Sequence, residues 1–313
     1  MIIQALYLAG KPIFPKIYKK KRSNLLPVGM LLVIYNTLAG NRGAQCVVDK
    51  LYEKLARMDI SYTSIENINL TPEKVDELFK SGDITHTIIS GGDGTVNHAL
   101  NALKEYLTKI PIGIVPCGYG NLISRSLGTY ELEDFLSEKS GYTGSEIKIG
   151  QANNRIFLNV ASVGLTADTV HIVERFRGTT FGAYIYRVMG GLMTHAFVFF
   201  AIQFRKAVFQ NHSDYPSSKT WLRTNNHETD NAFSVFLGVR ETMGQYKSLY
   251  LPKARFIPWS KKCTPATSDK YVIEHEQPFS WQIDGEPQEE TRSLTITFKC
   301  ERLFLCTITI DGC

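Results

Sequence analysis

The stretch Ser90-Gly-Gly-Asp-Gly-Thr-Val-Asn97 decides how the rest of the sequence is interpreted. It follows an apolar strand candidate, Thr85–Ser90, and precedes a segment with helical spacing, Val96–Leu107. Glycines let a ligand approach the backbone closely, and the free N–H groups at a helix N-terminus bind anions. Because an aspartate in such a loop repels phosphate, Asp93 indicates either Mg²⁺-nucleotide chemistry or a base that accepts a proton. The structural alternative is a tight turn capped by Asp93 and Thr95.

The order strand, loop, helix occurs four times in the first half of the chain. The strand candidates that begin these repeats are Met30–Tyr35, Ile60–Ile65, Thr85–Ser90 and Ile112–Val115. This alternation is typical of a parallel sheet, and ligands bind at the carboxyl ends of such strands. The glycine-containing loops Asn36–Gly43, Gly91–Thr95 and Pro116–Asn121 all fall there. We therefore predict an α/β nucleotide-binding domain over residues 29–135.

After about Tyr142 the sequence changes to short alternating segments separated by turn residues, a pattern typical of antiparallel sheets. The strand candidates are Glu146–Ile149, Arg155–Val160, Val198–Arg205, Ala232–Val239, Lys270–Ile273, Ser280–Ile283 and Ser293–Phe298. One helical stretch, Ala167–Thr194, interrupts them. We predict an antiparallel β-sandwich domain over residues 136–313, which would hold the substrate, and we allow for its C-terminal segment returning to the first domain.

The positive charge of the chain lies at its N-terminus. The 313 residues carry 35 Lys and Arg against 30 Asp and Glu, a net charge of +5. Six of the basic residues lie within residues 1–28, which hold no acid, so the remaining chain carries a net charge of −1. A body this close to neutral argues against a nucleic-acid partner. We predict that the basic arm contacts an anionic membrane surface through Lys16, Lys19, Lys20, Lys21 and Arg22.

The spacing of the cysteines and the hydropathy of the sequence indicate in which cellular compartment the protein resides. The cysteines are Cys46, Cys117, Cys263, Cys300, Cys306 and Cys313. None forms a C-x-x-C pair, which disfavours a structural zinc site and favours reduced thiols. No apolar run reaches the ~18 residues of a membrane span, and the basic cluster follows the apolar start of the chain, the wrong order for a secretory signal. We expect a cytoplasmic, peripherally membrane-associated protein, and we leave open a homodimer.

Several known nucleotide and hydrolase motifs are absent from the sequence. It lacks G-x-x-x-x-G-K-[ST], the H-R-D and D-F-G pair of protein kinases, G-x-S-x-G and H-E-x-x-H. The segment Gly118-Tyr-Gly-Asn-Leu-Ile lacks the third glycine of the dinucleotide motif G-x-G-x-x-G. These absences exclude the P-loop and protein-kinase classes and weaken a dinucleotide site.

Three of the loops, in this order, resemble the diacylglycerol kinase catalytic-domain family, which includes soluble bacterial lipid kinases and sphingosine- and ceramide-kinase-like proteins. The family elements N-P-x-[SA]-G, G-G-D-G-T-[VL]-N-E and P-x-G-T-G-N-D-[FL]-A-R correspond here to Asn36–Gly40, Gly91–His98 and Pro116–Arg125. A late D-G-E element corresponds to Asp284-Gly285-Glu286. The resemblance covers about residues 30–305 and is shared with NAD kinases in the nucleotide loop.

The resemblance implies transfer of the γ-phosphate of ATP, with Mg²⁺, to a lipid hydroxyl in phospholipid metabolism. Matching by position, the residues expected at the nucleotide are Asn36, Gly40, Gly91, Gly92, Asp93, Gly94, Thr95, Asn97, Gly118, Tyr119, Gly120 and Asn121. Asp284 and Glu286 are expected near the acceptor hydroxyl. Asp284 is favoured as the base and Asp93 as the ligand of the nucleotide-bound Mg²⁺, with Asp93 as the alternative base.

Two departures from the family pattern keep alternatives open. His98 replaces the usual glutamate, and Tyr119 replaces a small residue and could stack on the adenine or block it. The leading interpretation is a kinase of diacylglycerol-like lipids. The alternatives are a sphingosine-type kinase, an NAD kinase-like enzyme, or a catalytically weak relative that binds lipid or nucleotide.

Overall fold

The computed structural model describes residues 29–81, 83–118, 120–125, 127–137, 145–182, 184–185, 193–194, 197–198, 223–224, 227–228, 232–242, 245–252, 263–265 and 270–310. The predicted basic arm, Tyr119 and most of the predicted strand Val198–Arg205 lie outside them. The described residues fall into two compact units: an α/β unit up to Ile147 together with Cys300–Ile310, and a β unit over Lys148–Lys299. The division after Ile147 lies later than the boundary expected after residue 135.

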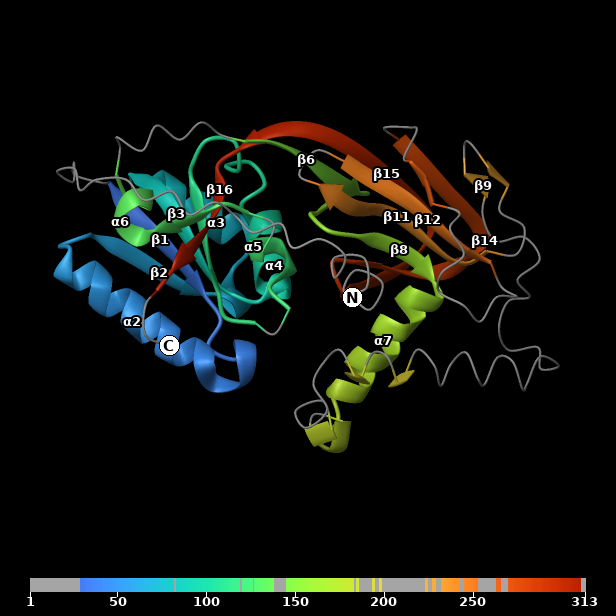
Figure 1. The fold of residues 1–313 in the computed structure, drawn as a ribbon, viewed down its shortest axis with the longest axis horizontal. Coiled ribbons are helices and arrows are strands. Elements are labelled where there is room, and N and C mark those ends of the chain that lie inside the picture. Colours follow the sequence, from blue (N-terminus) through green and yellow to red (C-terminus); the bar gives the residue numbers. More distant parts are fainter. Residues whose placement is uncertain are drawn as a thin grey trace. The chain divides into compact units, whose positions relative to one another are not determined.

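The α/β unit is built on a six-stranded parallel sheet with the strand order β2-β1-β3-β4-β16-β5. The strands are β1 (Met30–Tyr35), β2 (Tyr62–Glu66), β3 (Ile84–Gly91), β4 (Ile112–Pro116), β5 (Thr129–Glu131) and β16 (Leu305–Thr309). The first four correspond to the predicted strands. In Figure 1, β16 (red) runs within this sheet although it comes from the C-terminal end of the chain.

Helices follow the strands of the parallel sheet, as the alternation predicts. They are α2 (Gly43–Arg57), α3 (Pro72–Ser81), α4 (Asp93–Ala102), α5 (Leu122–Arg125) and α6 (Leu132–Phe135), with short 3₁₀ turns η1 (Ala39–Arg42) and η2 (Asn67–Asn69). Leu51 and Leu55 of α2 are fully buried against the sheet, as their spacing predicts. Thr71 caps α3, because its Oγ1 accepts the N–H of Lys74 at 3.2 Å.

The helix predicted over Val96–Leu107 is displaced in the structure, where α4 covers Asp93–Ala102. It begins earlier because Gly92 is extended and its carbonyl already accepts the N–H of Val96 at 3.0 Å. The glycines of the loop therefore do not delay the helix, and the loop sequence itself forms the first turn of α4.

The β unit contains one hydrogen-bonded, antiparallel ten-stranded sheet in the part of the chain that is described. Its main path is β13-β12-β11-β8-β14-β15-β6-β7; off this path, β9 pairs with β14, and β10 pairs with β9. The strands are β6 (Ser145–Ala152), β7 (Arg155–Phe157), β8 (Ala161–Gly164), β9 (Arg223–Thr224), β10 (His227–Glu228), β11 (Ala232–Thr242), β12 (Gln245–Pro252), β13 (Cys263–Pro265), β14 (Lys270–Ile283) and β15 (Glu286–Leu303).

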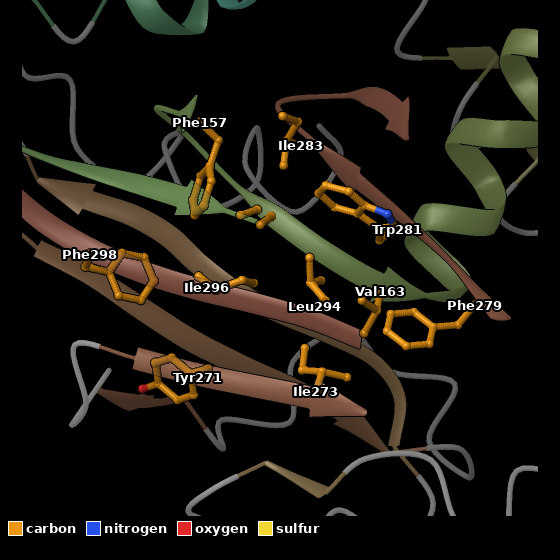
Figure 2. Packing of buried hydrophobic residues seen from close by; sticks show 12 residues of the cluster. Phe157, Val163, Tyr271, Ile273, Phe279, Trp281, Ile283, Leu294, Ile296 and Phe298 are labelled. Atoms are coloured by element: carbon orange, nitrogen blue, oxygen red, sulfur yellow. The ribbon is translucent and has the colours of Figure 1, made fainter. Parts of the chain in front are cut away.

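The hydrophobic core of the β unit lies on one face of this sheet, and Figure 2 shows its side chains. Alternate residues of β15, Leu294, Ile296 and Phe298, are buried there, as the two-residue period of a strand requires. The ring of Phe298 meets the rings of Phe157 and Tyr271 edge to face, each with 6.1 Å between ring centroids. This face fixes the register of β14 and β15, and with it the turn that joins them.

Helix α7 (Leu165–Arg177) follows β8 in the β unit. The helical stretch predicted over Ala167–Thr194 is therefore too long as one helix, since α7 ends at Arg177 and Gly178 caps it. In α7, His171 donates from Nε2 to the carbonyl oxygen of Trp281 in β14 at 3.1 Å. Among the described residues, no helix is long and apolar enough to span a membrane.

His86 in β3 makes the stability of the α/β unit dependent on pH. Its ring is buried against Phe135, with 5.4 Å between ring centroids, and burial lowers the pKa of His86 from 6.5 to about 4. As the pH falls, the unfolded chain binds this proton before the folded protein does. The difference in the pKa of His86 therefore stabilises the folded state by about 3 kcal/mol above pH 6.5. This stabilisation is lost progressively as the pH falls from 6.5 towards 4.

Urea unfolding of wild type and His86→Gln between neutral pH and about pH 4.5 tests this expectation. The wild type should lose more stability than the variant over this interval. Equal losses in the two proteins would mean that His86 does not remain neutral in the fold.

Candidate nucleotide and acceptor sites

Asn36 links the first loop to the second at the carboxyl edge of the parallel sheet. Its backbone N–H donates to the carbonyl oxygen of Ser90 at 3.0 Å, and its Nδ2 donates to Oγ1 of Thr95 at 3.0 Å. Its Oδ1 accepts the N–H of Leu38 at 3.0 Å, which turns the chain after β1. The asparagine predicted at the nucleotide therefore holds together the loops that follow β1 and β3.

The second loop brings backbone close to backbone through its glycines. A Cβ on Gly91 would lie 2.5 Å from the side chain of Thr95, and a Cβ on Gly118 would lie 2.6 Å from the Cα of Gly92. The residue before α4, Gly92, has no side-chain oxygen to offer to the first-turn N–H groups of the helix. Such a helix N-terminus suits an anion, and Gly94 lies in this first turn.

The third loop folds on itself through Asn121. This residue has a positive φ of 47°, its Oδ1 accepts the N–H of Gly118 at 2.9 Å, and its Nδ2 donates to the carbonyl oxygen of Gly118 at 2.7 Å. The N–H of Cys117 donates to the carbonyl oxygen of Gly91 at 2.9 Å, which joins the third loop to the second. Tyr119, also predicted here, is outside the described residues.

Asp93 connects the second loop to the third. Its Oδ1 accepts the N–H of Ile123, at the start of α5, at 2.9 Å. Its Oδ2 lies 2.9 Å from where a Cβ on Gly120 would be. The aspartate thus caps the helix after the third loop and not its own helix, which differs from the turn considered as the structural alternative.

Asn97 and His98 occupy different environments in α4. Asn97 is buried, and its Oδ1 accepts from Nδ2 of Asn101 at 3.2 Å, so it supports the helix interior. The Nδ1 of His98 donates to Oδ1 of Asn67 at 3.0 Å. Asn67 is not among the residues predicted from the sequence, although its place just after β2, at the same edge as the other loops, is the signal that could have identified it.

At the acceptor candidates, Asp284 and Gly285 form the two-residue turn between β14 and β15. Both have positive φ angles, 49° and 92°, which is the geometry of a type I′ hairpin turn. Oδ1 of Asp284 accepts the N–H groups of Asn159 and Val160 at 2.7 and 2.8 Å, and Oδ2 accepts that of Leu158 at 2.8 Å. Both oxygens of the predicted base are therefore bound to backbone. These three donors are not among the residues predicted from the sequence.

Glu286 lies two residues beyond Asp284, at the start of β15, with an exposed side chain. Although it keeps contact with water, surrounding protein partly desolvates it, and this together with the charge of Glu174 raises the pKa of Glu286. The carboxylate of Asp284 acts in the same direction, and Arg177 and Arg155 act against it. Arg177 also pairs with Glu174 at 2.9 Å. Glu286 is thus a solvent-facing carboxylate with both acidic and basic side chains near it.

The structure brings together the predicted nucleotide residues that lie in the described part of the α/β unit, apart from Asn97, which supports the interior of α4. Among the described residues, no group of three His, Cys, Asp or Glu side chains is placed to hold a metal ion. The three loops thus provide N–H groups and closely packed glycines, the arrangement that binds phosphate. Asp93 is an acidic side chain within this arrangement.

A parallel α/β unit with glycine loops, together with an antiparallel β unit, defines a class of fold found among lipid kinases. The described fold is similar to the crystal structure of a diacylglycerol kinase from Bacillus anthracis, with a TM-score of 0.53 and 16% identity over 88% of this chain and 96% of that one. Residues 30–150 match the family model of the diacylglycerol kinase catalytic domain, so the resemblance predicted from the loops is confirmed over that range.

Two curated relatives that match part of this chain are also named diacylglycerol kinase. The diacylglycerol kinase of Bacillus subtilis is 30% identical over 125 residues, which are 35% of this chain and 41% of the relative. The diacylglycerol kinase of Staphylococcus carnosus is 24% identical over 165 residues, which are 50% of this chain and 52% of the relative. The chain thus matches about half the length of these relatives.

Proposed function

We propose that this protein is an ATP-dependent kinase that transfers the γ-phosphate of ATP to the hydroxyl of a diacylglycerol-like lipid. The observation that carries the proposal is the contact among three loops in the family's order, through Asn36–Thr95, Gly92–Gly118 and Asp93–Ile123. These contacts leave a glycine-lined helix N-terminus where a Cβ would collide, and phosphate groups bind at such positions. The names of the relatives support a lipid as acceptor.

In this proposal the loops bind and orient the phosphates of the nucleotide. Positioning and charge stabilisation account for most of the catalysis of phosphoryl transfer. The N–H groups of Gly94 and Thr95 donate to phosphate oxygens, and Asn36 keeps the loop in register. Asp93 is the carboxylate of these loops that would hold a Mg²⁺ ion bound with the nucleotide, and such an ion would neutralise charge on the phosphate oxygens. One oxygen of Asp93 remains bound to the N–H of Ile123, which fixes the direction of the other.

At the acceptor we propose that Glu286 receives the proton of the lipid hydroxyl and that Asp284 positions it. Both oxygens of Asp284 accept backbone N–H groups, so its role is to hold the turn that presents Glu286. The raised pKa of Glu286 makes it a better proton acceptor than an ordinary glutamate. The sequence favours Asp284 as the base, and this proposal gives that role to Glu286 instead.

Phosphate transfer from labelled γ-ATP with Mg²⁺ to lipids in mixed micelles tests the proposed function. The acceptors are diacylglycerol, monoacylglycerol, sphingosine and ceramide, with NAD as a soluble control. We expect label on diacylglycerol, and we expect Asp93→Asn to reduce it by about 100-fold, because the amide keeps the oxygen that binds Ile123 but loses the charge. The matched control is Asp49→Asn on the exposed side of α2, which should retain full activity.

The pattern of labelled acceptors separates the alternatives. Label on sphingosine or on NAD in place of diacylglycerol would assign the protein to those kinase types. A folded protein that binds ATP but labels none of the acceptors would contradict the proposed transfer and indicate a binding protein related to the family.

We also propose that the basic arm brings the protein to an anionic membrane. Each basic residue near such a surface adds about 1 kcal/mol of attraction, so the cluster of Lys16, Lys19, Lys20, Lys21 and Arg22 is sufficient for reversible attachment. A lipid kinase meets its substrate at that surface.

A further inference from the structure

A buried glutamine, Gln282, holds the hairpin turn that precedes Glu286. Its Oε1 accepts the N–H of Gly285, inside the turn, at 2.8 Å. Its Nε2 donates to Oγ of Ser162 in β8 at 2.6 Å. Gln282 is only 4% exposed, and Ser162 is completely buried. The amide therefore uses both its oxygen and its nitrogen to fasten the turn to a neighbouring strand.

Strand pairing fixes the place of this glutamine. Gln282 in β14 lies directly opposite Ser162 in β8. Their sequence neighbours Trp281, Ile283 and Val163 belong to the hydrophobic core of the β unit, as Figure 2 shows. Because successive side chains of a strand point to opposite faces of the sheet, Gln282 and Ser162 point away from that core. The two side chains thus meet on the other face, where both are buried.

Packing alone does not require an amide at this position. A buried amide loses its hydrogen bonds to water, which an apolar side chain does not need, and the unbranched side chain of methionine fills space of similar shape. What the amide adds is direction, since a buried polar network in which every member is bonded holds one arrangement. The two bonds of Gln282 therefore indicate that it orients the turn.

Gly285 is the residue of the turn that most needs such a contact. The ladder between β14 and β15 ends with the pair Ile283 and Glu286, so the N–H of Gly285 lies beyond it. Glycine also has the widest choice of backbone angles, and Gly285 has a φ of 92°. Asp284 is already held by its carboxylate and by its N–H, which donates to the carbonyl oxygen of Val160 at 2.8 Å. Gln282 holds the second residue of the turn, the one joined directly to Glu286.

We propose that Gln282 is a positioning residue, which directs Glu286 towards the acceptor hydroxyl by holding Gly285 in place. This inference rests on the proposed function, in which Glu286 receives the proton of that hydroxyl. Gln282 itself touches no substrate, and it acts through the backbone of the turn. Because misplacement of a reacting group by about 1 Å costs about 100-fold in rate, loss of this contact should lower kcat.

The variants Gln282→Met and Gln282→Met/Ser162→Ala test the proposal. Both lack the bond to Gly285, and the second also removes the hydroxyl that Gln282 bonds. Since replacing both partners of a hydrogen bond by apolar groups is nearly neutral, thermal unfolding of the double variant should be close to that of wild type. We expect kcat for transfer to diacylglycerol to fall by about 10–100-fold in both variants. The KM for ATP should not change, because the nucleotide loops belong to the α/β unit.

Hydrogen exchange at the N–H of Gly285, followed by NMR, gives a readout that needs no activity. Exchange should be about tenfold faster in both variants, because this N–H loses its acceptor. The matched control is Gln151→Met in β6, whose Nε2 donates to the carbonyl oxygen of Asn153 in a different turn at 2.9 Å. This control should change neither kcat nor the exchange at Gly285.

A double variant with the stability and the kcat of wild type would overturn the proposal, because activity would then follow stability alone. Unchanged exchange at Gly285 would also overturn it, since the turn would not depend on Gln282. A wild type that labels no lipid would contradict the proposed function and the role of Gln282 in transfer, whereas faster exchange in the variants would still establish that Gln282 holds the turn.

Discussion

Replacing Asp284 by alanine is expected to lower the free energy of unfolding by about 4 kcal/mol. The N–H groups of Leu158, Asn159 and Val160, which donate to its carboxylate, belong to residues that are at most 5% exposed. Hydrogen bonds to a charged acceptor contribute about 1.5–3 kcal/mol each, and removal of the acceptor leaves buried donors without it. The turn is partly exposed, so water replaces some of the lost hydrogen bonds, and the expected value is smaller than the sum of three full bonds.

The matched variant is Glu286→Gln, which should leave the free energy of unfolding within about 0.5 kcal/mol of wild type because its side chain is exposed. Its phosphate transfer should fall by about 10²–10⁴-fold, the usual contribution of a proton acceptor. In wild type the acid limb of kcat/KM should lie above the ordinary range of glutamate, because a raised pKa means that Glu286 loses its basic form at a higher pH. This limb should be absent from the residual activity of Glu286→Gln.

Denaturant unfolding and a pH profile of transfer distinguish the roles of the two carboxylates. An Asp284→Ala protein that is as stable as wild type but inactive, beside an active Glu286→Gln protein, would make Asp284 the base and refute our assignment. A control substitution at Glu289, an exposed residue of β15, should change neither stability nor transfer.

The nucleotide loops could be predicted from the sequence because local patterns determine them. Buried apolar runs form the parallel strands β1, β3 and β4, and their carboxyl ends necessarily meet at one edge of the sheet. The glycines between each strand and the next helix indicate where the backbone must approach closely. A reader of the sequence can therefore place Asn36, Asp93 and Asn121 at one edge without knowing their hydrogen-bond partners.

Contacts between distant parts of the chain could not be predicted in this way. The strand β16 fills the sheet between β4 and β5, but no local signal in Leu305–Thr309 indicates a parallel pairing with Ile112. The carboxylate of Asp284 is satisfied by N–H groups more than 120 residues earlier in the sequence. For this reason a motif that marks Asp284 as important could not tell a base from a residue that anchors a turn.

The second large effect is expected for Gly40→Ala in the first loop. Gly40 has a φ of +59°, and a Cβ there would overlap the carbonyl oxygen of Cys117 in the third loop. Strain at positive φ costs about 1–3 kcal/mol and a forced overlap about 1–3 kcal/mol, so we expect a loss of about 4 kcal/mol in the free energy of unfolding. ATP binding measured by calorimetry should weaken as well, because the third loop must move away from Gly92 to make room.

Gly43→Ala is the control for this prediction, only three residues further along the chain. Gly43 begins α2 with a φ of −67°, and a Cβ there would meet nothing within 4 Å. Alanine should therefore leave ATP binding unchanged and raise the free energy of unfolding by about 0.5–1 kcal/mol, because it favours the helix and restricts the unfolded chain. If the two alanine variants behave alike, the approach of Gly40 to Cys117 is not what holds the first loop against the third.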